Sequence, residues 1–182
     1  GRQGYVGLQS KTLGRLTLGR QYNTMFDSFL HAAPIRFGAM YEPVFQLLGH
    51  DARSDNTIKY TGTFGKITTI AHYSFGVGVT MLGMSPLTNG GGGEVAGNPR
   101  DNSAFGAGVK YTSDGLILSA SYNQWNAAVA PGKPSPAKKA GIAASYVIGP
   151  AKIMGCYRWG NGESDTGVTL LRDDFYWAGI QY

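Results

Sequence analysis

The sequence contains a single cysteine, Cys156, among 182 residues. One thiol excludes an intrachain disulfide and leaves export to an oxidising compartment neither shown nor excluded. No apolar run approaches the roughly 18 residues that a membrane-spanning helix needs. The formal net charge of +5 suggests an anionic partner, yet no basic run is longer than Lys138-Lys139. A nucleic-acid footprint is therefore not indicated.

Motifs for metal binding and catalysis are also lacking. His31, His50 and His72 have no metal-site spacing, and Cys156 has no neighbouring ligand. Gly90-Gly91-Gly92-Gly93 is not followed by the Lys-Ser/Thr of a phosphate loop. A hydrolase would need a histidine with Ser or Asp on neighbouring strands, and only His72 lies in an expected strand. The sequence thus predicts no cofactor, no metal and no enzyme.

Glycine and tyrosine are abundant instead, with 28 Gly and 11 Tyr, as in turn-rich β proteins. Alternation of apolar and polar residues predicts strands, paired as hairpins. Most are about 8–10 residues long, enough to cross a bilayer when tilted. The expected strands are 5–8, 15–22, 56–60, 66–75, 105–111, 116–123, 141–147, 152–159 and 175–182.

The connections are expected to alternate between short turns and long polar loops, the long ones being 21–55, 76–102, 124–140 and 160–173. Sorting of loop length by sheet end is typical of transmembrane β-barrels. A soluble β-sandwich, for example a carbohydrate-binding module, has no reason to sort its loops. The sequence therefore favours an all-β, antiparallel up-and-down barrel, with the sandwich as the alternative.

Charged residues follow the polar phase of the expected strands. Lys59, Lys110, Lys152 and Arg158 oppose apolar neighbours, so they are expected to face the lumen, and Lys66 with them. Several apolar faces end in Tyr or Trp, where an interfacial aromatic girdle would lie. The strand 66–75 fits less well, because Ile67 and Ile70 fall on opposite faces.

The segment 21–55 differs from the rest of the chain. It is too long for an ordinary connection and shows no sustained alternation. Its many apolar residues argue against disorder. It is therefore expected to be a packed loop folded into the barrel lumen.

Four blocks of sequence resemble one known family. They are Arg2-Gln3-Gly4-Tyr5-Val6-Gly7-Leu8, Leu16-Thr17-Leu18-Gly19-Arg20-Gln21-Tyr22, the stretch from Arg53 to Thr61, and the turn Gly149-Pro150. Together they are similar to general diffusion porins of Gram-negative bacteria, especially the betaproteobacterial type. The resemblance runs along essentially the whole chain.

The resemblance implies a porin domain over 1–182, forming about nine strands of a sixteen-stranded outer-membrane barrel, with 21–55 as the inward-folded constriction loop. The chain starts within an expected strand, which suggests a piece of a longer protein. Porins of this kind are homotrimers embedded in outer-membrane lipid that pass ions and small hydrophilic solutes by passive diffusion.

The resemblance also implies a charged constriction. By motif match its basic side is Arg2, Arg20 and Arg53, with Glu42 and Asp51 as the acidic loop residues. Strict alternation places Arg20 in phase with the apolar positions 16 and 18, so it is expected at the rim or beyond a β-bulge.

Charge is divided unevenly between the segment 21–55 and the other residues. The segment has four acidic and two basic residues, whereas the remainder has seven acidic and fourteen basic ones. An acidic loop opposite a basic wall would set a transverse field across a narrow pore. The excess on the wall predicts mild anion preference.

Overall fold

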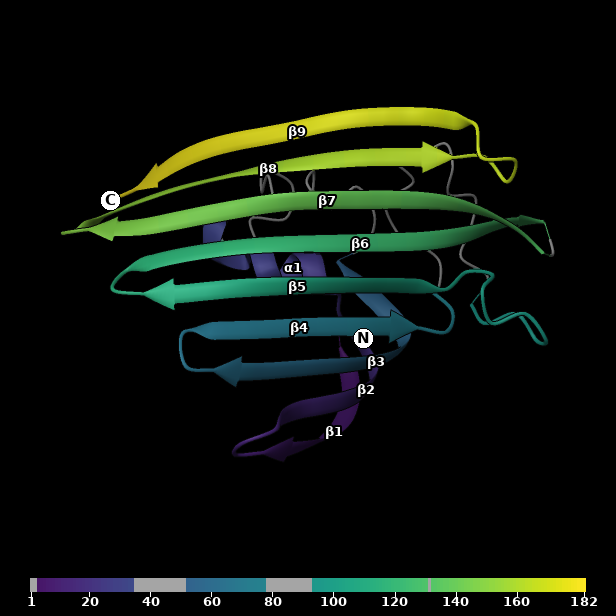
Figure 1. Ribbon diagram of the computed structural model, residues 1–182, viewed down its shortest axis with the longest axis horizontal. Helices are drawn as coiled ribbons and strands as arrows, with labels where there is room; N and C mark the ends of the chain where they lie inside the picture. The colour runs from purple at the N-terminus through teal and green to yellow at the C-terminus, as the bar shows by residue number, and fades with distance from the viewer. Residues whose placement is uncertain (1–2, 35–51, 78–92, 131) are drawn as a thin grey trace.

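The computed structural model describes residues 3–34, 52–77, 93–130 and 132–182. Within these ranges, nine strands form one antiparallel sheet in chain order (Figure 1). The strands are β1 (Gly4–Ser10), β2 (Gly14–Tyr22), β3 (Arg53–Phe64), β4 (Ile67–Ser74), β5 (Ala104–Ser113), β6 (Leu116–Ala130), β7 (Lys133–Ile148), β8 (Ala151–Glu163) and β9 (Thr169–Gln181). Helix α1 (Thr24–Phe29) and the 3-10 turn η1 (Leu30–Ala32) follow β2. This order confirms the up-and-down arrangement and excludes the sandwich alternative.

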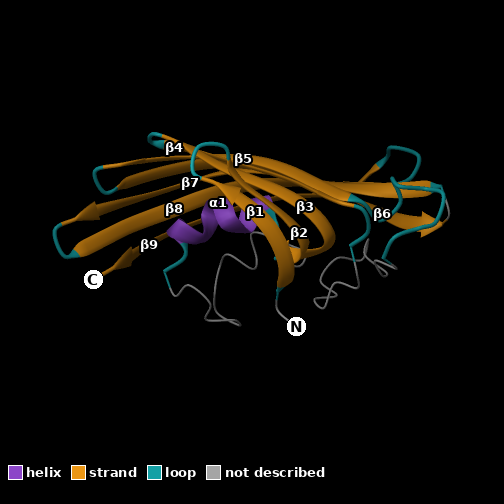
Figure 2. Cartoon of the chain, turned by 90° about the horizontal axis from the view of Figure 1, so that it is seen from below, coloured by secondary structure: helices purple, strands orange, loops and turns teal. Residues whose placement is uncertain are grey.

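The sheet is curved, and α1 lies on its concave side (Figure 2). Short connections of two or three residues (11–13, 65–66, 114–115 and 149–150) join strands at one end. The β5–β6 turn is Asp114-Gly115, with φ of 46° and 82°. Asp-Gly is a favoured pair for tight hairpins because both central residues need positive φ. In the described residues no helix is long and apolar enough to span a membrane.

The two faces of the sheet differ as the alternation predicted. The outward positions carry exposed apolar and aromatic side chains, among them Leu16, Leu18, Ile58, Val109, Leu118, Ile142, Ile153 and Tyr157. The concave positions carry buried polar ones, among them Thr17, Thr57, Lys59, His72, Ser119, Ser121, Asn123, Ser145 and Arg158. Ile70 is the exception noted in the sequence: it is buried on the inner side, whereas Ile67 is exposed.

The prediction of a loop at 124–140 is wrong. Strands β6 and β7 continue through it and pair as far as Ala130 with Lys133. The prolines suggested a loop because proline cannot donate to a ladder. However, β7 pairs with β8 only from Ala137 onward. Pro136 therefore lies where β7 has one neighbour, and an edge position tolerates proline.

The loop expected at 160–173 is also too long. Strand β8 extends to Glu163 and β9 begins at Thr169. The difference in loop length between the two ends of the sheet is therefore smaller than predicted, because the β6–β7 connection, at the end with the long loops, has only two residues. Lys66 is not on a strand: it lies in the β3–β4 turn, where Nζ is 3.8 Å from the Asp114 carboxylate.

The segment 21–55 contains regular structure that the sequence analysis missed. Its first two residues belong to β2 and its last three to β3, and α1 begins after Asn23. The Asn23 side chain caps the helix by accepting a hydrogen bond from the Phe26 amide at 2.9 Å. Met25, Phe26 and Phe29 are almost fully buried. This described part packs on the sheet, and residues 35–51 lie outside the described residues.

Glycines on the inner face let α1 approach the sheet backbone. A Cβ atom on Gly108 of β5 would lie 2.5 Å from Ser28 Oγ and 2.9 Å from Thr24 Cγ2. A Cβ atom on Gly141 of β7 would lie 3.0 Å from the Phe29 ring. These distances are shorter than van der Waals contact, so larger residues would displace the helix.

We expect Gly108→Ala to loosen α1 by about 1–3 kcal/mol, through overpacking. Backbone amides of α1 should then exchange hydrogen roughly ten- to hundredfold faster than in the unsubstituted protein. Gly4→Ala is the matched control, because a Cβ there meets nothing within 4 Å. Equal exchange rates in the two variants would contradict this packing.

Candidate functional site

Cationic side chains from several strands lie on the inner face of the sheet, which is the face that α1 packs against. Lys59, Lys110, Lys152 and Arg158, predicted to face the lumen, lie on the inward phase of β3, β5 and β8. Lys139 of β7 shares that face. Among the described residues in this region, two carboxylates accompany them, Asp27 of α1 and Asp173 of β9.

Lys59 connects the strand wall to the helix. Its side chain is only 4% exposed and forms an ion pair with Asp27. Lys59 Nζ also donates to the Tyr22 carbonyl at 2.9 Å. A buried ammonium needs such partners, since leaving it unpaired is costly. The pair therefore helps to hold α1 on β3.

His72 lies beside this pair, directly opposite Lys59 in the β3–β4 register. Its Nδ1 atom accepts a hydrogen bond from the Thr24 amide at 3.3 Å and is 2.6 Å from Thr24 Oγ1. Thr24 Oγ1 also lies 3.4 Å from the Gly106 carbonyl. The first residue of α1 is thus bound to β4 and β5.

His31 anchors the other end of the inner segment, which is formed by α1 and η1 (residues 24–32). Its Nδ1 atom is 2.9 Å from Ser145 Oγ on β7, and its Nε2 atom is 2.9 Å from Ser119 Oγ on β6. Lys152 Nζ donates to the His31 carbonyl at 2.5 Å. Burial, with the ammonium groups of Lys110 and Lys152, lowers the pKa of His31 from 6.5 to about 4. The imidazole is neutral at pH 7.

Arg158 forms a bidentate ion pair with Asp173, with both N–O distances 2.7 Å. The guanidinium is almost fully buried, whereas the Asp173 side chain is 45% exposed. Gly160 lies opposite Asp173 in the β8–β9 register, where a Cβ atom would collide with both groups. A fork-to-fork pair fixes the direction of the arginine.

Three proposed constriction residues fall outside the described residues: Arg2, Glu42 and Asp51. The other two, Arg20 and Arg53, lie at the ends of β2 and β3 where the inner segment is connected. Arg20 pairs with Asp55 at 2.5 Å, and the Arg53 guanidinium lies 5.2 Å from the centre of the Tyr22 ring. The β2–β3 register shifts after Gly19, which is the bulge allowed for in the sequence analysis.

Sequence reasoning missed the residues that hold the inner segment in place. Asp27 was counted only as loop charge, and His31 only as a residue without metal spacing. Asn23, followed by apolar residues at 25, 26 and 29, was a usable signal for a capped helix. No local signal could have paired Asp173 with Arg158, because their contact depends on the β8–β9 register.

The histidine–serine contacts do not form a catalytic site. Both ring nitrogens of His31 are occupied by serine hydroxyls, and within the described part of the chain no carboxylate orients the ring. His72 contacts a threonine. The described ranges also contain no group of three or more His, Cys, Asp or Glu that could hold a metal.

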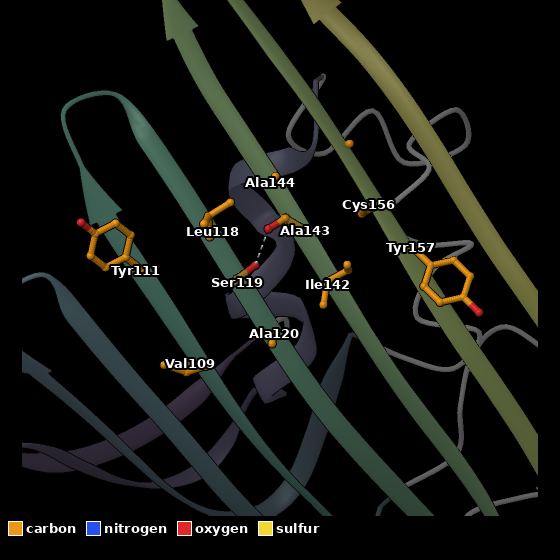
Figure 3. Close-up of a pocket in the computed structure, with 11 residues that line it drawn as sticks. Val109, Tyr111, Leu118, Ser119, Ala120, Ile142, Ala143, Ala144, Cys156 and Tyr157 are labelled. Carbon is orange, nitrogen blue, oxygen red and sulfur yellow. Dashed lines mark hydrogen bonds between the residues drawn. The ribbon is translucent and has the colours of Figure 1, made fainter.

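The outer face carries an apolar hollow of about 570 Å³. Figure 3 shows Val109, Leu118, Ile142 and Tyr157 around it, with α1 behind the sheet. This hollow lies on the face opposite to the charged inner face. The side chains that line the hollow suit contact with lipid, and none of the cations described above is among them.

Comparison with known proteins identifies the family. The sequence profile of the Gram-negative porin family matches residues 1–182. An outer membrane porin protein of Bordetella pertussis is 31% identical over 131 residues, which cover 70% of this chain and 32% of that protein. The anion-selective porin from Comamonas acidovorans superposes with a TM-score of 0.75 at 19% identity, covering 98% of this chain and 52% of that one.

The chain therefore spans about a third to a half of the length of these two proteins. Its sheet has the porin fold, and the family consists of non-enzymatic channels. The chain belongs to the Gram-negative porin family and resides in the outer membrane.

Proposed function

We propose that the complete protein is a homotrimeric outer-membrane channel for passive diffusion of ions and small hydrophilic solutes, with a mild preference for anions. The observation that carries the proposal is the excess of cations over carboxylates among the described residues of the inner face beside α1. Lys110 on β5 and Lys152 on β8 flank the two central strands whose serines contact His31. Lys139 of β7 and Arg158 of β8 lie further along the same inner face.

The segment 21–55 is proposed as the constriction loop of a domain that covers 1–182. The position of α1 and η1 on the concave face supports this role (Figure 2). Arg2, Arg20 and Arg53 are proposed as the basic side of the narrow section, and Glu42 and Asp51 as acidic loop residues. These five assignments come from motif match.

The strength of the electrostatic interaction determines how strongly such a wall favours anions over cations. Two unit charges about 4 Å apart interact by roughly 4 kcal/mol at an effective dielectric of ~20, against about 1 kcal/mol in bulk water. An excess of a few cations on the wall can therefore bias which ions enter. Salt screens the interaction beyond a Debye length of about 10 Å at 0.1 M, so the preference should weaken as salt rises.

The Comamonas porin supports the sign of the preference, since that protein is anion-selective. At 19% identity the likeness shows the fold alone, so the charge arrangement of this chain has to carry the argument. In this chain Asp27 and Asp173 are each paired with one cation. Among the described residues of this face, the inner cations outnumber these two carboxylates.

Replacing Lys110 by Gln in the complete protein should shift the reversal potential in a KCl gradient toward cation selectivity. The expected reason is loss of one half-buried inner charge. Lys11→Gln is the matched control, because it removes the same charge from an exposed turn between β1 and β2. If both variants shift the potential equally, the inner face does not govern selectivity.

Replacing Arg2 and Arg53 together with Ser tests the proposed basic side of the constriction. The double variant should move the reversal potential toward cations by more than Lys110→Gln does, since two charges are lost from the narrowest section. A potential that stays at the unsubstituted value would show that these arginines do not line the constriction.

A further inference from the structure

The inner segment is attached to the wall by histidines at both of its ends. Thr24, the first residue of α1, is bound to His72 of β4. His31 in η1 is itself bound to Ser119 of β6 and Ser145 of β7. The segment between them buries Phe26 and Phe29 against the sheet.

The bond from the Thr24 amide to His72 requires one protonation state of Nδ1, whereas the Thr24 hydroxyl, 2.6 Å from the same atom, can donate or accept. A backbone amide can only donate, so the Thr24 amide at 3.3 Å requires Nδ1 of His72 to be an acceptor without a proton. An imidazolium donates from both nitrogens and would lose this bond. The groups facing His72 are Thr24, the Gly106 carbonyl bound to Thr24, and Lys59 with its carboxylate Asp27.

The surroundings of His31 also disfavour a charged ring. Serine hydroxyls can donate or accept, so Ser119 and Ser145 accommodate either state. Ser119 Oγ additionally donates to the Ala143 carbonyl at 3.4 Å (Figure 3). The charged groups that act on the ring within the described residues are Lys110 of β5 and Lys152 of β8. An imidazolium would add a third positive charge to this partly buried site.

We propose that His31 and His72 are positioning residues that hold α1 and η1 on the wall only while both imidazoles are neutral, so that acid loosens the inner segment. The loosening of the segment follows from the Thr24 amide bond to His72 and from the two lysines beside His31. Its effect on conduction rests on the proposed function, because conduction responds only if the segment narrows the channel.

Proton linkage determines whether acid strengthens or weakens docking of α1 and η1, and over which pH range. The pKa of His31 is lowered from 6.5 to about 4 when the segment is docked, so the undocked state binds more protons between these values. Docking is therefore fully stable above about pH 6.5 and weakens as the pH falls toward 4. One proton changes the docking equilibrium by about tenfold for each pH unit within this range.

The test compares hydrogen exchange of residues 23–33 in the complete protein with that in the double variant His31→Gln/His72→Asn. Asn at position 72 keeps an acceptor oxygen for the Thr24 amide, and neither replacement titrates. Asp27 and Lys59 are unchanged, so their ion pair is common to both proteins. Amides of the β6–β7 hairpin serve as the internal reference at each pH.

The ratio of exchange rates, unsubstituted protein over double variant, should rise at least about tenfold for each pH unit from pH 6.5 to about 4.5, because His31 alone contributes one proton. A ratio that stays constant over this range overturns the proposal. The single variants His31→Gln and His72→Asn provide the same comparison if the double variant does not fold. Each should then show a weaker pH dependence than the unsubstituted protein, and an undiminished dependence in both overturns the proposal.

Single-channel conductance of the same proteins separates the inference from the proposed constriction. If exchange accelerates in acid and the conductance of the unsubstituted protein changes over the same pH range, both are supported. If exchange accelerates while conductance stays constant, the histidine contacts act as proposed but the segment does not narrow the channel. If the exchange ratio is constant, the inference fails whatever the conductance does.

Discussion

The packing of α1 on the glycine positions of β5 and β7 is the contact on which the organisation of the inner face depends. Gly108 and Gly141 leave room for Ser28 and Phe29 directly against the strand backbone. The close approach brings Asp27 to Lys59 and the carbonyl of His31 to Lys152. Apolar contact thus provides the binding area, whereas the polar contacts around it set the position of the segment.

This arrangement requires the sheet to keep its two faces distinct. In lipid, strands must satisfy their backbone groups through pairing, and their outward side chains must be apolar. The outward row formed by Val109, Leu118 and Ile142 meets that demand. A register slip of one residue would exchange this row with the buried polar row, so the register is strongly determined. Because the register is fixed, the inner cations also occupy fixed positions.

The strand phase could be predicted from sequence because alternation on each strand is local. Strand ends could not, since Pro136 is compatible with a loop or with a strand that has one neighbour. Helix α1 has only six residues, too few for a helical period to stand out, although Asn23 marked its start. Cross-strand contacts such as Arg158 with Asp173 depend on register. All five predicted constriction residues, Arg2, Arg20, Arg53, Glu42 and Asp51, stay predictions.

The central claim is that α1 lies against the inner face of the sheet in the membrane-embedded protein. Disulfide formation between Ser28→Cys and Gly108→Cys, in a Cys156→Ala background, tests it directly in intact outer membranes. A Cβ at position 108 lies 2.5 Å from Ser28 Oγ, so the two sulfurs fall within bonding reach after small adjustment. Nearly complete cross-linking is expected under mild oxidation. Two free thiols that stay open to labelling under the same conditions would contradict it.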